Sequence, residues 1–185
     1  MLGGAVLSNP VICASDIQSS VTKDEVMALS RMAAGRIVLE IGCGAGRLTV
    51  GLASQAQRVH ALDSHGGSGM QGNTLSEFIN NIKRYRVVDN VVAHIGDEEK
   101  TLLTLQRDVF HAVIMHGPRA LALITTSDGL LRTFMGSGKC KLFVRALEPE
   151  DEKRLDTFAT KNQVDNREFF GKFRIVGGAN VAVAR

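Results

Sequence analysis

The fold is decided by the stretch Arg36-Ile-Val-Leu-Glu-Ile-Gly-Cys-Gly-Ala-Gly-Arg-Leu-Thr49 of this 185-residue chain. Four of the five residues at 37–41 are apolar, as expected for a parallel strand that is buried on both faces. Three glycines then follow on alternate positions, which lets the backbone turn sharply and approach a ligand without interference from a Cβ atom. A strand, a glycine turn and a helix in this order form the ligand-binding corner of doubly wound α/β proteins.

The spacing of the glycines distinguishes between two kinds of cofactor. A dinucleotide-binding loop reads G-x-G-x-x-G/A. Here Glu40 precedes Gly42, Gly44 and Gly46 in the form E-x-G-x-G-x-G, and Arg47 occupies the sixth position. This form resembles the first motif of class I methyltransferases that depend on S-adenosylmethionine (SAM). The resemblance implies SAM as the cofactor and S-adenosylhomocysteine (SAH) as its product.

Length and composition predict one globular domain over residues 1–185, with residues 1–19 as an N-terminal arm. A net charge of +3 is too small to indicate a nucleic-acid surface, so a nucleic-acid partner is disfavoured. Cysteines number three and show no metal spacing, which favours reduced thiols and a cytoplasmic location. No stretch approaches the ~20 apolar residues of a membrane span. The oligomeric state stays open.

The remaining sequence alternates strand and helix patterns. Thr22-Lys-Asp-Glu25 and Thr74-Leu-Ser-Glu77 are capping boxes that begin two helices. Arg167 to Val176 and Asn180 to Ala184 flank Gly177-Gly178, which predicts a C-terminal hairpin. This order resembles the class I methyltransferase fold, an α/β, doubly wound, seven-stranded and mostly parallel sheet closed by an antiparallel hairpin. The expected strands before the hairpin are 36–41, 58–63, 91–95, 109–115 and 140–144, and the expected helices begin near 22, 46, 74, 97, 118 and 149.

The resemblance implies cofactor contacts after each of the first three strands. In that family the first loop surrounds the methionine part of SAM, an acid ending the second strand bonds the ribose, and an acid after the third meets the adenine amino group. From the residues alone, the glycines could also form an ordinary tight turn, Asp63 a solvated strand end and Asp97 a helix N-cap. Cys43 is interpreted as a small filler beside the cofactor. The matching positions are Glu40, Gly42, Cys43, Gly44 and Gly46, then Asp63 and Ser64, then Gly96, Asp97 and Glu98.

The downstream pattern is similar to a subgroup of small-molecule O-methyltransferases in which acids after the fourth and fifth strands can bind a divalent metal. Here those places read His116-Gly117 and Arg145-Ala146. A lone imidazole cannot replace an oxygen cage for Mg²⁺ or Ca²⁺, so no catalytic metal is expected. The (N/D)PPY signature of base-amino methyltransferases is also absent from the sequence, which disfavours adenine-N6 methylation.

His116 is the expected catalytic residue, because it follows the central fourth strand and imidazole titrates in the range needed to take a proton from a hydroxyl group. A loop histidine that bonds a neighbouring carbonyl is the alternative. His65 is a second candidate on the glycine-rich segment His65–Gly72, which is predicted to close over the site as a lid. The predicted function is SAM-dependent methyl transfer to a small molecule, at oxygen. The alternatives are a SAM- or SAH-binding protein without catalysis and a nucleotide-binding oxidoreductase.

Overall fold

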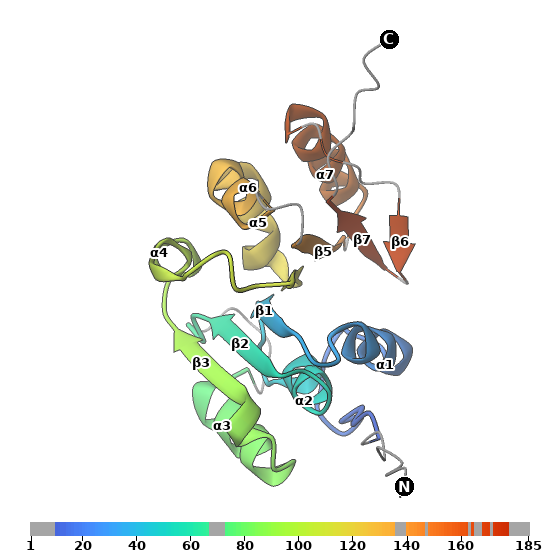
Figure 1. Ribbon diagram of the computed structural model, residues 1–185, viewed down its shortest axis with the longest axis vertical. Helices are drawn as coiled ribbons and strands as arrows, with labels where there is room; N and C mark the ends of the chain where they lie inside the picture. The colour runs from blue at the N-terminus through green and yellow to red at the C-terminus, as the bar shows by residue number, and fades with distance from the viewer. Residues whose placement is uncertain are drawn as a thin grey trace, which may run out of the picture.

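The structure is a computed structural model that describes residues 10–66, 73–135, 140–146, 148–162, 164, 168–170 and 172–177. Helices cover both faces of one sheet (Figure 1). The strands are β1 (Ile37–Ile41), β2 (Arg58–Asp63), β3 (Val91–Ile95), β4 (Ala112–Met115), β5 (Lys141–Arg145), β6 (Glu168–Phe170) and β7 (Phe173–Val176). The helices are α1 (Lys23–Met32), α2 (Arg47–Ala53), α3 (Leu75–Arg84), α4 (Glu98–Thr104), α5 (Pro118–Thr126), α6 (Asp128–Met135) and α7 (Pro149–Asn162), with a short 3-10 turn, η1 (Val88–Asn90).

The sheet has seven strands in the order β3-β2-β1-β4-β5-β7-β6. The strands from β1 to β5 pair in parallel, and β7 runs antiparallel to both β5 and β6. The predicted fold class is therefore confirmed. Strand order reverses between β1 and β4, and open α/β sheets bind ligands beyond the carboxyl ends of the strands at such a switch point.

Two hydrophobic cores lie on the two faces of the sheet. Side chains alternate between the faces along a strand, so Val38 packs with α1, α2 and α3, whereas Leu39 and Ile41 pack with α4 to α7. Figure 1 shows α1, α2 and α3 on one side of the sheet and α4, α5, α6 and α7 on the other. Because β1 is buried on both faces, the turn that follows it is held in place by both layers.

The helix starts follow the local sequence closely. Thr22 and Glu25 form the full capping box of α1, and the Thr74 side chain accepts the N–H of Glu77 at the start of α3. Pro118 and Pro149 occupy the first turns of α5 and α7, where a missing backbone N–H leaves no helical hydrogen bond unmade.

The predicted first arm of the C-terminal hairpin, Arg167 to Val176, is two antiparallel strands and not one. Its two strands, β6 and β7, both lie within residues 168–176, and residues 178–185, which include the predicted second arm, lie outside the described residues. Gly177 is the last described residue and directly follows β7. A Cβ atom there would lie 3.2 Å from the Lys141 side chain, so glycine allows the end of β7 to approach β5 closely.

Two other predictions change in extent. β4 begins at Ala112 and not at Val109, because Phe110 turns into the core and packs against His60 and Phe134. The N-terminal arm is described from Pro10 onward, and its Ile17 is buried in the core beneath α1, α2 and α3. In the described part of the chain, no helix combines the length and the apolarity that crossing a membrane requires.

Candidate functional site

A cavity of about 150 Å³ lies at the carboxyl edge of the sheet, over the switch point between β1 and β4. It is lined by the glycine turn after β1, by the ends of β2 and β4, and by the segment that precedes α1. The lining residues are Gln18, Ser19, Ser20, Gly42, Cys43, Gly44, Ala45, Gly46, Arg47, Asp63, Asn73, Glu77, Glu98, His116, Gly117, Pro118, Arg119 and Ala120.

The glycine turn forms the floor of this cavity. Gly42 has φ +86°, and a Cβ atom there would lie 2.0 Å from the backbone oxygen of His116. Real Cβ atoms do not make contacts that short, so only glycine lets the end of β1 lie against the end of β4. Gly44 follows at φ +55° with the Asn73 side chain above it. The turn is thus a backbone cradle that any side chain would fill.

Asp63 connects this cradle to the end of β2. Its Oδ2 accepts the backbone N–H of Gly44 at 2.9 Å, and its Oδ1 accepts the N–H of His65 at 2.8 Å. The carboxylate is buried yet lines the cavity, and each of its oxygens keeps acceptor capacity beyond these single bonds. Nearby, the side-chain oxygen of Asn73 is buried without a hydrogen-bond partner. Two acceptors therefore face the same space and suit a ligand that donates hydrogen bonds.

The acids after β3 divide into two roles. Asp97 is exposed and caps α4, with its Oδ1 accepting the N–H of Lys100 at 2.9 Å. Neither Asp97 nor Gly96 lines the cavity, whereas the buried carboxyl group of Glu98 does. The N-cap interpretation of Asp97 therefore describes its position, and Glu98 is the acid of this pair that reaches the candidate site.

Glu40 and His116 form a buried pair between β1 and the loop after β4. Glu40 is fully buried, and it accepts hydrogen bonds from Thr49 Oγ1 at 2.6 Å and from His116 Nε2 at 2.9 Å. A carboxylate can only accept, so the proton is assigned to Nε2, and in the neutral imidazole this assignment leaves the lone pair on Nδ1. His116 lines the cavity and Glu40 does not. The structure therefore places Glu40, a predicted cofactor contact, behind His116.

Of the other predicted site residues, Cys43 lines the cavity, whereas Ser64 and His65 do not. Cys43 is buried beside the glycines, and burial, together with the nearby Glu40 and Asp63 carboxylates, raises the pKa of its thiol well above the usual value. Ser64 receives a hydrogen bond from Arg119. His65 packs its ring against Phe78, away from the lining. Residues 67–72, most of the predicted lid, lie outside the described residues.

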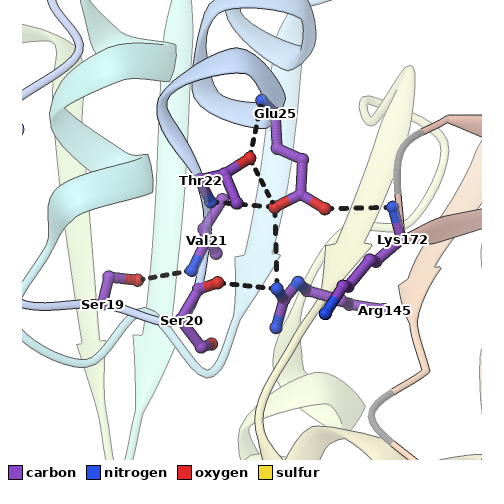
Figure 2. Close-up of polar contacts among 7 residues, drawn as sticks. All are labelled: Ser19, Ser20, Val21, Thr22, Glu25, Arg145 and Lys172. Carbon is purple, nitrogen blue, oxygen red and sulfur yellow. Dashed lines mark hydrogen bonds and ion pairs between the residues drawn. The ribbon is translucent and has the colours of Figure 1, made fainter.

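A second buried polar cluster lies at the end of β5, where the family resemblance would place an acid (Figure 2). Arg145 is 3% exposed, and its Nη2 donates to the carbonyl oxygen of Ser20 at 2.6 Å and lies 3.6 Å from Glu25 Oε2. Glu25 also accepts the backbone N–H groups of Thr22 at 2.8 Å and Lys172 at 3.0 Å. The cluster joins the segment before α1, the end of β5 and the start of β7.

The charge of Glu25 is maintained by these contacts. Burial opposes its ionisation, but the N–H groups of Thr22 and Lys172 and the guanidinium of Arg145 outweigh that cost, and the pKa of Glu25 lies below its usual value. Arg145 therefore faces a carboxylate and not a ligand. Within the residues that the structure describes, no group of three or more metal-ligating side chains is present.

Several lining residues were not predicted from the sequence. They are Gln18 to Ser20, Arg47, Asn73, Glu77 and Arg119. Arg47 could have been found, because it directly follows the last glycine of the motif, and so could Asn73, because it precedes the capped start of α3. Gln18 to Ser20 carry no local signal, because α1 and the long-range contact with Arg145 bring them to the cavity.

Comparison with known proteins supports the fold and leaves the sequence family open. No protein-family model matches the chain, and a search of curated proteins finds no match. Among solved structures, precorrin-6y C5,15-methyltransferase from Geobacter metallireducens is 14% identical, with a TM-score of 0.67 over 91% of this chain and 97% of that chain. P. horikoshii TYW2 in complex with MeSAdo is 16% identical, with a TM-score of 0.59 over 87% and 62%. A complex of aTrm5 with tRNALeu is 15% identical, with a TM-score of 0.57 over 87% and 46%. The chain therefore has the fold of class I methyltransferases.

Proposed function

We propose that this chain, which has the class I methyltransferase fold, binds SAM in the cavity over Gly42 to Gly46 and transfers its methyl group to the oxygen of a small molecule. The observation that carries the proposal is the glycine cradle together with the Asp63 carboxylate that is bonded to it. Because its glycines have no Cβ atoms, the cradle lets a ligand lie directly on the backbone. Asp63, Asn73 and Glu98 supply acceptors for the hydroxyl and amino donors of an adenosine group.

The chemistry at the acceptor falls to His116. SAM supplies an activated methyl group, so the protein has to align the acceptor, exclude water and accept a proton. Glu40 holds His116 Nε2–H, and this leaves Nδ1 as the nitrogen that can take the proton of an acceptor hydroxyl. The acceptor oxygen then forms the new bond to the methyl carbon as the bond from that carbon to sulfur breaks, and SAH remains. Glu40 thus has the role of a positioning residue.

The proposed acceptor class rests on the charge of the chain and not on the similar structures. Their names include a precorrin methyltransferase and a protein bound to tRNA, so they do not point to one acceptor. A net charge of +3 favours a small acceptor over a polyanion that binds through a basic surface.

Calorimetry with SAH and NADH tests the cofactor, with Gly44→Val as the informative variant. The branched side chain would project into the cradle beside Asn73, so SAH affinity should fall roughly a hundredfold or more, equivalent to about 2.8 kcal/mol. Gly35→Val is the matched control. Gly35 also has a left-handed φ, +68°, but its Cβ would meet nothing within 4 Å, and it precedes β1 at the opposite edge of the sheet. It should share the backbone strain and keep SAH binding.

Two results would contradict the proposal. NADH binding without SAH binding would favour the oxidoreductase alternative, and equal SAH affinity in the two glycine variants would show that SAH does not lie on the glycine turn. A separate assay follows methyl transfer from labelled SAM to a cell extract. Tight SAH binding without any transfer would favour the SAM- or SAH-binding protein without catalysis.

A further inference from the structure

A second cavity, of about 420 Å³, lies at the amino edge of the sheet, opposite to the edge that carries the candidate site. We refer to it as the amino-edge pocket. It is lined by α1, by β5 and β7, and by the residues that directly precede β1 and β4. Its volume lies within the range of about 300–1,000 Å³ that is typical of small-molecule sites.

Three basic residues line the amino-edge pocket, each at the amino end of a parallel strand. Arg36 precedes β1, His111 precedes β4, and Lys141 is the first residue of β5. These strands are neighbours in the sheet. The backbone N–H of His111 donates to the Ile37 carbonyl at 3.0 Å, and that of Lys141 donates to the His111 carbonyl at 3.4 Å. Parallel pairing therefore brings together three basic residues that are far apart in the sequence.

Arg36 and His111 keep hydrogen-bond donors for a ligand. Within the described ranges, the Arg36 guanidinium has no polar partner. The Nδ1 atom of His111 lies 3.4 Å from both the backbone nitrogen and the carbonyl oxygen of Ile37, which holds the ring against β1, and Nε2 has no polar partner in the same ranges. Among the described residues that line the pocket, none carries a carboxyl group. A guanidinium fork matches the paired oxygens of a carboxylate or a phosphate.

The rest of the lining is apolar. Leu29 and Phe143 are 1% and 6% exposed, and the half-buried Ala28, Met32 and Ile175 complete this surface. The three residues from α1 share one face of the helix, because residues three and four positions apart are neighbours. Phe143 and Ile175 are paired across β5 and β7. Partly exposed apolar side chains beside basic groups suit a ligand that has an apolar body and a charged end.

We propose that the amino-edge pocket binds an organic anion with an apolar body, namely an alkyl or aryl chain that carries one carboxylate or phosphate group. The anionic group lies at Arg36 and His111, and the chain lies on the apolar face of α1 and on Phe143. The candidate site has both acids and arginines in its lining, whereas the amino-edge pocket has bases alone, so an anion is favoured at the amino edge. This inference does not depend on the proposed function.

The binding energy is divided unequally between the two parts of the ligand. Arg36 and His111 are exposed to solvent, and ionic contacts of exposed groups contribute little. Burial of the chain supplies the larger share, because the favourable free energy grows with the apolar area that is removed from water. The charged groups then select an anion over a neutral molecule with the same chain.

A titration of the whole chain followed by NMR tests the inference with three ligands that share one chain. Sodium octanoate and octyl phosphate should shift the amide resonances of α1 and β5 in a saturable way. 1-Octanol, which lacks the charge, should bind roughly tenfold more weakly, as expected for the loss of two exposed ionic contacts. The tighter of the two anions identifies whether the head group is a carboxylate or a phosphate.

Arg36→Glu reverses the charge at the head group. It should weaken octanoate by roughly tenfold and change 1-octanol by less than about twofold. Arg132→Glu is the matched control, because Arg132 is exposed on α6, whose buried side chains pack on the other face of the sheet. It makes the same change in net charge and should leave both ligands within about twofold of the wild type. Ala28→Phe removes no charge, and its ring should fill the pocket and weaken all three ligands.

Four results would overturn the inference. They are equal affinity for octanoate and 1-octanol, equal loss of octanoate in Arg36→Glu and Arg132→Glu, unchanged octanoate affinity in a folded Ala28→Phe protein, and the absence of saturable shifts at α1 and β5. The amide spectrum of each variant also shows whether it is folded, so a loss of binding is not confused with unfolding.

Discussion

The two sides of the cavity use their polar groups in opposite ways. On the β2 side, Asp63 holds the glycine turn and still presents acceptor capacity to the cavity, and Asn73 presents an acceptor without a partner. On the β5 side, the polar groups at the strand ends turn inward to carboxylates in the protein interior. His116 is bonded to Glu40, and Arg145 is paired with Glu25.

This difference suggests that the β2 side serves cofactor binding, whereas the β5 side serves catalysis and the stability of the fold. The acceptor groups on the β2 side suit a ligand that donates hydrogen bonds. Substitutions there should therefore lower the affinity for the cofactor. In the proposed function the β5 side supplies one nitrogen, His116 Nδ1, for the reaction, and Arg145 holds the carbonyl group of Ser20 in the segment before α1. Substitutions on the β5 side should therefore lower the turnover rate or the stability of the fold. Substitutions on the two sides should therefore have separable effects.

The largest effect is expected from His116→Gln. Removing a general base typically slows a reaction by about 10² to 10⁴-fold, and among the described residues at the β4 end of the cavity His116 is the one imidazole or carboxyl group. SAH affinity should stay within about twofold of the wild type, as for a group that the cofactor does not contact. Methyl transfer from labelled SAM and SAH calorimetry measure the two quantities. A loss of SAH affinity equal to the loss of turnover would place His116 on the binding side and break the comparison.

Glu40→Gln tests whether His116 acts alone. Glutamine keeps an oxygen acceptor for Nε2–H but removes the charge that stabilises the imidazolium. Turnover should fall less than in His116→Gln, and the pH at which activity is half-maximal should change. Unchanged turnover and an unchanged pH profile would reduce Glu40 to a structural residue.

The next effect concerns stability at the β5 side. Arg145→Met leaves Glu25 buried without its cation, and breaking one partner of a buried pair typically costs about 3–5 kcal/mol. The free energy of unfolding in urea should fall by roughly 3 kcal/mol on that basis. The double variant with Glu25→Gln removes the unpaired charge and should recover part of the loss. Equal instability of the single and double variants would show that Arg145 stabilises the fold by packing alone.

A smaller effect is expected on the β2 side. Asp63→Ala removes a charged acceptor, which typically costs ~1.5–3 kcal/mol, so SAH should bind about ten- to a hundredfold more weakly. The N–H of Gly44 also loses its partner, so Asp63→Asn, which keeps an oxygen acceptor, is the control for turn geometry. Unchanged SAH affinity in a folded Asp63→Ala protein would assign this residue to another ligand.

The sequence predicted the β2 side better than the β5 side. The glycine turn and the acid that ends β2 lie in local patterns with fixed spacing, and their positions follow from one strand and one turn. The pair of His116 and Glu40 joins residues 76 positions apart, and no local pattern signals it. Glu25 shows the limit most clearly. Its capping box was predicted correctly, but the same carboxylate also bonds Arg145 and the N–H of Lys172, and only the assembled sheet brings those groups together.

The smallest expected effect is that of removing divalent metal. A metal bound at the β4 and β5 ends would need several hard oxygen ligands. The first of those places holds an imidazole whose Nε2 is bonded to Glu40, and the second holds the guanidinium of Arg145, a cation that repels Mg²⁺. Turnover should therefore be the same before and after dialysis against EDTA, within the error of the assay. Activity that is lost in EDTA and restored by Mg²⁺ would mean that residues outside the described ranges supply the oxygens. In that case the β5 side would take part in binding, and the separation of the two sides would no longer hold.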